Sequence, residues 1–224
     1  MPHTPPFPAR IILLDLDGTL VDTAPDLHRA TNHVLESLDR PPVSLDQTRH
    51  MVGQGARKLI ELGLKATGGD SDIGMETLLD RFLTFYGAHL SEASTPYPGA
   101  HTLLGDLAQA GYWPAVCTNK PEGLARRLLA ELELDRHIRT LSGGDSFTFR
   151  KPDPRHLSET ARRLGPDPFL LVGDSISDTR AATAANVPCI VVRHGYSDRP
   201  PEELGGSCLV AHLADIPALL RPVG

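Results

Sequence analysis

Two aspartates follow the first strongly apolar run of the chain. The run Ile11-Ile12-Leu13-Leu14 has the length of a strand, and Asp15 and Asp17 come directly after it. Side chains two residues apart on an extended chain project to the same side, so both carboxylates could face one site. Two like charges this close are unfavourable unless a cation or a shared proton relieves them, which makes the pair a candidate Mg²⁺ site. The alternative is that the two acids only solubilise the end of a strand.

A second polar group follows the apolar run at 115–117. Here Thr118, Asn119 and Lys120 succeed one another. Ligands of open α/β sheets bind beyond the carboxyl ends of the strands, which makes these residues candidates for substrate contact. The Thr118 hydroxyl and nearby backbone N–H groups could hold phosphate oxygens, although a threonine in this place also suits a helix cap.

Two further acids follow the apolar run at 169–172. Asp174 comes after this run, and Asp178 lies four residues later, where the next helix is expected to begin. A third carboxylate near Asp15 and Asp17 would complete an oxygen-rich magnesium shell. Capping of the following helix by Asp174 or its neighbour is the alternative role, and both roles are physically compatible.

One lysine stands in a restricted stretch of backbone. Lys151 lies in Arg150-Lys151-Pro152-Asp153-Pro154, where two prolines limit the local conformation. Its ammonium could bring a positive charge to the carboxylates as phosphate binds. The alternative is an ordinary solvated surface lysine.

The strands that would position these residues form an α/β pattern. Apolar runs of strand length recur at 11–14, 115–117, 169–172 and 190–192, with helical patterns between the later ones. The runs are apolar on successive residues, as expected for strands buried on both faces. Alternation of such strands with helices predicts a doubly wound parallel sheet.

Two local features depart from this scheme. The proline-rich first eight residues predict a loose tail. Pro114 predicts a strand that starts after it or is irregular there.

About a hundred residues separate the first two runs, too many for one crossover, and they are rich in helical spacing. Residues 27–38 and 78–90 both carry apolar side chains at helical intervals. We therefore expect an inserted α-helical subdomain at 23–94 and a core formed by 1–22 and 95–224.

Composition narrows the class of protein. The formal net charge is −6 and no long basic run occurs, which argues against a nucleic-acid surface. No apolar stretch approaches the roughly 18 residues of a membrane span, and the start of the chain lacks a signal-peptide pattern. Three widely spaced cysteines suit reduced thiols better than disulfides or zinc ligands. We therefore expect a cytoplasmic globular protein; its oligomeric state cannot be read from the sequence.

These motifs together resemble those of one enzyme superfamily. In sequence order the chain contains Asp15-Leu16-Asp17-Gly18-Thr19-Leu20, Thr118-Asn119-Lys120, Lys151-Pro152-Asp153-Pro154 and Gly173-Asp174-Ser175-Ile176-Ser177-Asp178. They resemble the four ordered motifs of haloacid dehalogenase-like phosphatases, and the resemblance covers nearly the whole chain. The inserted helices resemble the cap domain of that superfamily. Further segments resemble phosphoglycolate phosphatases in particular, namely 21–27, Val52-Gly53-Gln54-Gly55-Ala56, Gly143-Gly144-Asp145 and the stretch through His194-Gly195-Tyr196.

The resemblance implies a phosphoryl-transfer mechanism. Asp15 would attack phosphorus and form a phospho-aspartate, which agrees with the known use of aspartate as a covalent phosphoryl acceptor. Asp17 would then be the general acid and base. Mg²⁺ would be held by an Asp15 carboxylate oxygen, the Asp17 backbone carbonyl and Asp174.

The resemblance also assigns the supporting residues. Asp178 would support the metal site, while Lys151 and Thr118, with Asn119 beside it, would contact the transferring phosphate.

Several activities compete with the phosphatase interpretation. A dehalogenase is disfavoured, because a halide leaves without a proton and Asp17 would have no task. Another small-metabolite phosphatase, a pyrophosphatase or a sugar phosphomutase would share the same four motifs. A catalytically idle phospho-ligand binding protein is also possible on this fold, although every matched catalytic position is occupied.

The substrate is expected to be a small phosphate ester, because a cap that excludes water favours small molecules over phosphoproteins. Likeness to the family points to 2-phosphoglycolate. The segment 53–57 could form a turn into a helix that binds the glycolate carboxylate, with Arg57 as its cation. The alternative is a glycine turn that merely starts a helix.

Overall fold

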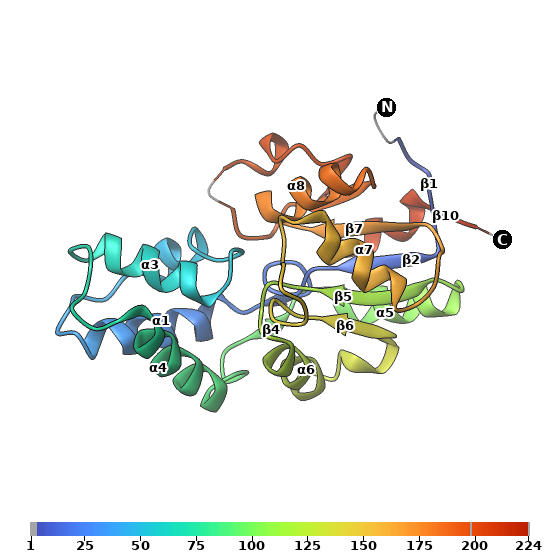
Figure 1. Cartoon of the computed structure of the whole chain (residues 1–224). Coiled ribbons are helices and arrows are strands. Elements are labelled where there is room, and N and C mark those ends of the chain that lie inside the picture. The colour runs from blue at the N-terminus through green and yellow to red at the C-terminus, as the bar shows by residue number, and fades with distance from the viewer. Residues whose placement is uncertain (1–3, 198, 224) are drawn as a thin grey trace.

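The computed structural model describes residues 4–197 and 199–223, and a six-stranded parallel sheet lies at its centre (Figure 1). The strand order is β6-β5-β2-β7-β8-β9. The chain fills one side of β2 first and then returns to the other side, so the order reverses at the strand that carries Asp15. This is the predicted doubly wound arrangement. The strands are β2 (Ile11–Leu14), β5 (Trp113–Cys117), β6 (Thr140–Ser142), β7 (Phe169–Gly173), β8 (Cys189–Val192) and β9 (Cys208–Val210).

Helices cover both faces of the sheet (Figure 1). Within β2, Ile12 and Leu14 join an apolar cluster with α5 and α6, whereas Ile11 and Leu13 join a second cluster with α7 and α8. Both sets of side chains are fully buried. The prediction of strands buried on both faces is therefore confirmed. The four helices are α5 (Ala100–Gln109), α6 (Glu122–Glu131), α7 (Pro154–Arg162) and α8 (Ile176–Ala185).

Pro114 lies inside β5 and pairs in register with Ile12 of β2, so the expectation of a strand that starts after it or is irregular there was wrong. The N–H of Trp113 donates to Arg10 on the β2 side. The missing N–H of Pro114 therefore faces the other neighbour, β6, whose pairing begins only opposite Ala115. No ladder hydrogen bond is lost at this position, which explains why proline is tolerated.

The predicted loose tail is also corrected in part. Strand β1 (Phe7–Ala9) pairs in parallel with β10 (Leu220–Pro222) near the other end of the chain. The Phe7 side chain is buried in the main apolar cluster. Residues 1–3 of the expected tail lie outside the described part of the chain.

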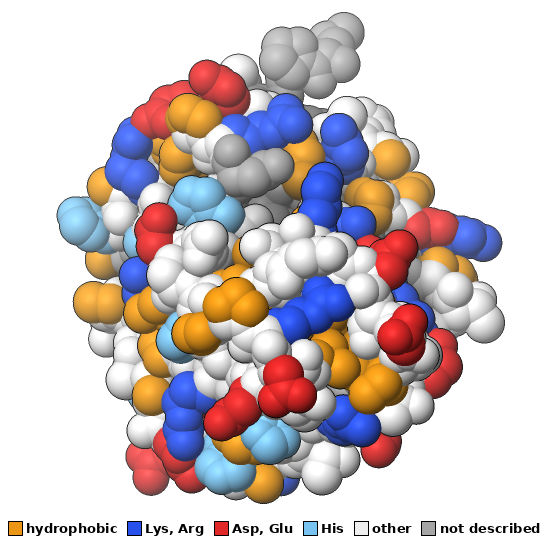
Figure 2. Space-filling model, turned by 90° about the vertical axis from the view of Figure 1, so that its left-hand side faces the viewer, with side chains coloured by type: hydrophobic (Ala, Val, Ile, Leu, Met, Phe, Trp, Pro, Cys, Tyr) orange, Lys and Arg blue, Asp and Glu red, His pale blue; other side chains and the backbone are white. Residues whose placement is uncertain are grey.

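The first four helices after β2 stand apart from the sheet (Figure 1). We call them the inserted helices: α1 (Ala24–Glu36), α2 (Leu45–Arg49), α3 (Ala56–Ala66) and α4 (Met75–Ala88). All fall within the expected range 23–94. The face that they present to solvent mixes acidic and basic side chains with scattered apolar ones (Figure 2). Buried apolar residues of α1, α3 and α4 belong to one cluster. Within residues 4–197 and 199–223, no helix combines the length and apolarity required to cross a membrane.

Two short antiparallel strands, β3 (Val21–Asp22) and β4 (Thr95–Pro96), carry the chain into and out of the inserted helices. Next to them the buried carboxylate of Asp26 accepts hydrogen bonds from the backbone N–H groups of Ala93 and Ser94, at 2.9 Å and 2.7 Å. The Ser94 hydroxyl donates to the same oxygen. Asp26 thus fastens the start of α1 to the returning segment.

Candidate active site

The predicted residues converge at the carboxyl ends of the central strands. Asp15 follows β2, Thr118 follows β5 and Asp174 follows β7, and all three are buried. Parallel strands end at one edge of a sheet, which is why residues far apart in the sequence meet here. Lys151 reaches the same place from the segment before α7: its Nζ lies 2.9 Å from Asp15 Oδ1 and 2.6 Å from Asp178 Oδ1.

Three of the acids form a group that suits a divalent cation. Asp15, Asp174 and Asp178 each offer a carboxylate oxygen, and these oxygens lie within 4.8 Å of one another. Burial, outweighing the opposing effect of Lys151, raises the pKa of Asp15 from 3.8 to about 7, and the charges of Asp178 and Asp17 add to the rise. Burial followed by Asp178 and Asp15 also raises the pKa of Asp174. Carboxylates that repel one another in a buried site fit the oxygen shell of Mg²⁺, which would relieve this repulsion.

Two glycines make room for Asp174. The Thr19 hydroxyl donates to its Oδ1 at 2.6 Å, and the Tyr196 N–H donates to its Oδ2 at 2.7 Å. A Cβ on Gly18 would lie 2.3 Å from Oδ2, and one on Gly195 would lie 2.0 Å from the Asp174 Cβ. Gly18 also has a φ of +87°, which favours glycine.

Asp178 has partners on both carboxylate oxygens. Its Oδ1 faces Lys151, and its Oδ2 accepts from the Ser175 N–H at 3.0 Å and the Ser175 hydroxyl at 2.6 Å. Ser175 precedes α8, so these hydrogen bonds cap the helix. Ser175, one of the two capping residues considered, is therefore the N-cap of α8, and Asp178 completes its capping box while it contacts Lys151.

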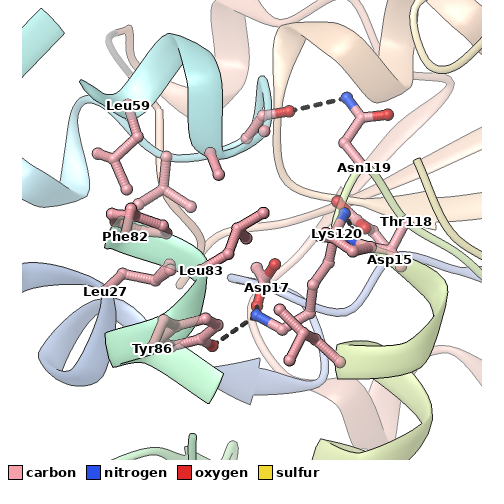
Figure 3. A pocket seen from close by; sticks show the side chains of 16 residues that line it. Asp15, Asp17, Leu27, Leu59, Phe82, Leu83, Tyr86, Thr118, Asn119 and Lys120 are labelled. Carbon is pink, nitrogen blue, oxygen red and sulfur yellow. Dashed lines mark hydrogen bonds and ion pairs between the residues drawn. The ribbon is translucent and has the colours of Figure 1, made fainter. Parts of the chain in front are cut away.

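Asp17 lies outside the group of three and pairs with a different lysine. Its Oδ1 lies 3.0 Å from the Nζ of Lys120. The same Nζ donates to the hydroxyl of Tyr86 at 2.5 Å (Figure 3). Tyr86 belongs to α4, so an inserted helix reaches the core here. From the sequence, Lys120 was one of three polar candidates after an apolar run and Tyr86 was part of a helical pattern, and their contact was not predicted.

Thr118 and Asn119 line the same cavity as Asp15 and Asp17. Thr118 Oγ1 accepts the Lys120 N–H at 3.2 Å, which leaves its hydroxyl proton free to donate. The Asn119 amide already donates to Gly53 O at 3.1 Å and to Lys151 O at 3.0 Å. Its side chain therefore joins the loop before α3 to the core and has no amide proton left for phosphate.

Arg57 is not brought into this cavity. Its guanidinium forms an ion pair with Glu76, also on the inserted helices, and it lines a separate cavity of about 260 Å³. Gly55 does precede the first residue of α3, as the glycine turn predicted. A contact between Arg57 and substrate stays a prediction.

The cavity at the site is small and lies between the sheet and the inserted helices (Figure 3). It measures about 40 Å³. Asp15, Asp17 and Thr118 stand on its core side, and the opposite wall is largely apolar, formed by Leu27, Leu59, Phe82 and Leu83 among others. This arrangement places the carboxylates of Asp15 and Asp17 and the Thr118 hydroxyl side by side on the core wall of one cavity.

A doubly wound sheet with these side chains at its carboxyl edge defines a class of hydrolase. The family model described as haloacid dehalogenase-like hydrolase matches residues 12–192, and the chain belongs to this family. It is therefore an enzyme, a hydrolase of the phosphatase kind.

Individual proteins of this family are similar to the chain over most of its length. The chain is 44% identical to a phosphoglycolate phosphatase of Agrobacterium fabrum over 94% of its length and 92% of that protein. It is 42% identical to a phosphoglycolate phosphatase of Mesorhizobium japonicum, with 90% of each chain covered. The crystal structure of a predicted phosphoglycolate phosphatase from Haemophilus somnus superposes with a TM-score of 0.87, at 28% identity, over 93% of this chain and 96% of that one. The resemblance noted from the motifs is thus confirmed.

Proposed function

We propose that the protein is a magnesium-dependent phosphatase that hydrolyses 2-phosphoglycolate to glycolate and orthophosphate through a phospho-aspartate at Asp15. The observation that carries this proposal is the buried pairing of Asp15 with Lys151, beside the two acids Asp174 and Asp178. The names of the relatives support the choice of substrate.

The first half-reaction uses Asp15 as nucleophile. Its Oδ1 is held by Lys151 and by the Leu16 N–H at 2.8 Å, and its Oδ2 accepts no hydrogen bond from the described residues. Oδ2 attacks phosphorus while the ester P–O bond breaks, and Asp17 gives a proton to the departing oxygen. Lys151 and the Thr118 hydroxyl offset negative charge on the transferring group.

The second half-reaction reverses the role of Asp17. Its carboxylate takes a proton from water, the water oxygen attacks phosphorus, and the bond to Asp15 breaks to release orthophosphate. Mg²⁺ bound by Asp15, the Asp17 carbonyl and Asp174 would supply electrostatic stabilisation of the phosphoryl oxygens. Asp178 would support that site by holding Lys151.

The cavity favours a small leaving group. A volume of about 40 Å³ leaves little room beyond the transferring phosphoryl group. The part of phosphoglycolate beyond the ester oxygen has only four heavy atoms. A sugar phosphate or a bisphosphate intermediate is larger, so the phosphomutase alternative would require the inserted helices to stand further from the core. Dehalogenation remains disfavoured because a halide leaves without a proton, so the proposed general acid Asp17 would have no task.

A substrate panel with and without Mg²⁺ tests the proposal. Release of orthophosphate would be followed for 2-phosphoglycolate, a sugar phosphate, pyrophosphate and a nitrophenyl phosphate. We expect Mg²⁺-dependent turnover with the highest kcat/KM for 2-phosphoglycolate. Preference for pyrophosphate or for a sugar phosphate would replace the proposed substrate, and absence of any turnover would support the binding-protein alternative.

A further inference from the structure

The charge of the active-site cavity is unevenly distributed. Apart from Asp15 and Asp17, Lys120 is the one charged side chain among its lining residues within the described chain. The inserted helices contribute apolar side chains and the ring of Tyr86 (Figure 3). An anionic group on a substrate in this cavity would therefore meet a single positive charge.

Two contacts hold the ammonium of Lys120 in place. Its Nζ lies 3.0 Å from Asp17 Oδ1 and 2.5 Å from the Tyr86 hydroxyl, and it stands 4.4 Å from the centre of the Tyr86 ring. The side chain is only 2% exposed. An ammonium group has three N–H donors, so two are used by these partners and one is left. A fixed, desolvated donor of this kind suits a carboxylate better than a mobile surface lysine would.

We propose that Lys120, held by Tyr86, binds the carboxylate of the substrate's leaving group and so determines specificity for acidic phosphate esters. This inference rests on the proposed function, because it concerns the non-phosphate end of the same substrate. The side chain of Asp17 pairs with the same ammonium, which places the general acid beside the leaving group that Lys120 would hold. Arg57 is the competing candidate, and its pairing with Glu76 outside the cavity disfavours it.

Matched esters separate recognition of the carboxylate from damage to catalysis. Ethyl phosphate has the two-carbon leaving group of 2-phosphoglycolate without its carboxylate. Lys120→Met should lower kcat/KM for both esters, because Asp17 loses its partner. The ratio of kcat/KM for phosphoglycolate to that for ethyl phosphate should fall by about ten- to a hundredfold, the scale of a charge-assisted hydrogen bond. Equal losses on the two esters would overturn the proposal.

Two further variants sharpen the test. Tyr86→Phe keeps the ring and removes the hydroxyl, so the ratio should fall in the same direction by about two- to tenfold. It also serves if Lys120→Met fails to fold. Lys65→Met, an exposed lysine on α3, is the matched control and should leave the ratio unchanged. A fall of the ratio in Arg57→Gln but not in Lys120→Met would assign the carboxylate contact to the arginine instead.

Binding without turnover distinguishes this inference from the proposed function. The phosphonates 3-phosphonopropionate and propylphosphonate copy the two esters and cannot be hydrolysed at the bridging carbon. Calorimetric titration of the full chain with Mg²⁺ should give tighter binding of the carboxylate-bearing compound, and Lys120→Met should abolish the difference. Equal affinities in the unaltered protein would overturn the inference even if phosphoglycolate is hydrolysed. Unequal affinities that depend on Lys120 would support it even if phosphoglycolate is not the substrate turned over.

Discussion

Lys151 Nζ lies 2.9 Å from Asp15 Oδ1, and both side chains are almost completely shielded from solvent. Although burial lowers the pKa of Lys151, the charges of Asp15 and Asp178 raise it above its usual value, so the lysine stays charged. The ion pair with Lys151 and the hydrogen bond from the Leu16 N–H both hold Oδ1 of Asp15, and Oδ2 accepts no hydrogen bond from the described residues. In the proposed mechanism, this pairing would leave Oδ2 as the attacking oxygen.

Asp15→Asn should lower phosphate release by at least about a thousandfold, because an amide is a poor nucleophile and a weaker metal ligand. The fold should persist, and Tm should be equal or higher, since burial disfavours the Asp15 carboxylate. Phosphate release and thermal unfolding would be measured on the same preparation. Near-normal hydrolysis would remove Asp15 as the nucleophile.

Asp17→Asn should affect esters according to their leaving group. General acid catalysis contributes about 10²–10⁴-fold, so we expect a loss of this size for ethyl phosphate. Loss with 4-nitrophenyl phosphate should be at least tenfold smaller, because nitrophenolate needs less protonation. Rates for both esters would be compared at one pH. Equal losses would refute the general-acid role while leaving the pairing with Lys120 untouched.

Stability of the metal-free protein should fall as pH rises from about 4 to about 7. The pKa of Asp15 is about 7 in the folded protein against 3.8 unfolded, so the folded state binds more protons in this window. The free energy of unfolding then decreases with pH, by up to about 1.4 kcal/mol per unit for this group.

Mg²⁺ should reverse this dependence. It binds the deprotonated carboxylates, so its increase in Tm should be larger at about pH 8 than at about pH 5. Thermal unfolding in EDTA and in millimolar Mg²⁺ across this range checks both statements. A Tm unaffected by Mg²⁺ at every pH would argue against a metal site at these acids, and Asp174→Asn should abolish the increase.

Asp26→Asn should destabilise the junction between core and inserted helices. One of the oxygens that accepts from Ala93 and Ser94 would be replaced by an N–H donor facing other donors. A buried unsatisfied polar group costs about 1–3 kcal/mol, which corresponds to roughly 2–12 °C in Tm for a chain of this size. Asp80→Asn, an exposed position on α4, is the matched control. Identical Tm values for the two variants would contradict the fastening role.

The sequence was sufficient for the sheet and for the core acids because both depend on local patterns. Buried parallel strands require continuous apolar runs, and the residues after Leu14 and Val172 therefore had to meet at one edge. The contact between Tyr86 and Lys120 could not be predicted, because a helical period identifies which face of a helix is buried but not which residues of the core that face contacts. The pairing of Arg57 with Glu76 depends on how α3 packs against α4, which no local pattern encodes.

The sequence was also silent about strands at the margins. Strands β1 and β10 have three residues each and lie more than two hundred positions apart. Segments this short carry too little periodicity to be recognised, and their pairing follows only once the sheet has brought them together.

Val21 and Asp22 pair antiparallel with Pro96 and Thr95, so the segments that enter and leave the inserted helices are adjacent. The chain leaves and re-enters the core through neighbouring strands, so the covalent connections of the insert lie side by side and do not pass through the sheet. Its length and sequence can therefore change without any strand of the core having to move. Exchange of the residues between these two strands for the corresponding segment of a relative would replace Tyr86 and the apolar wall of the cavity while Asp15, Asp17 and Lys120 stay in place.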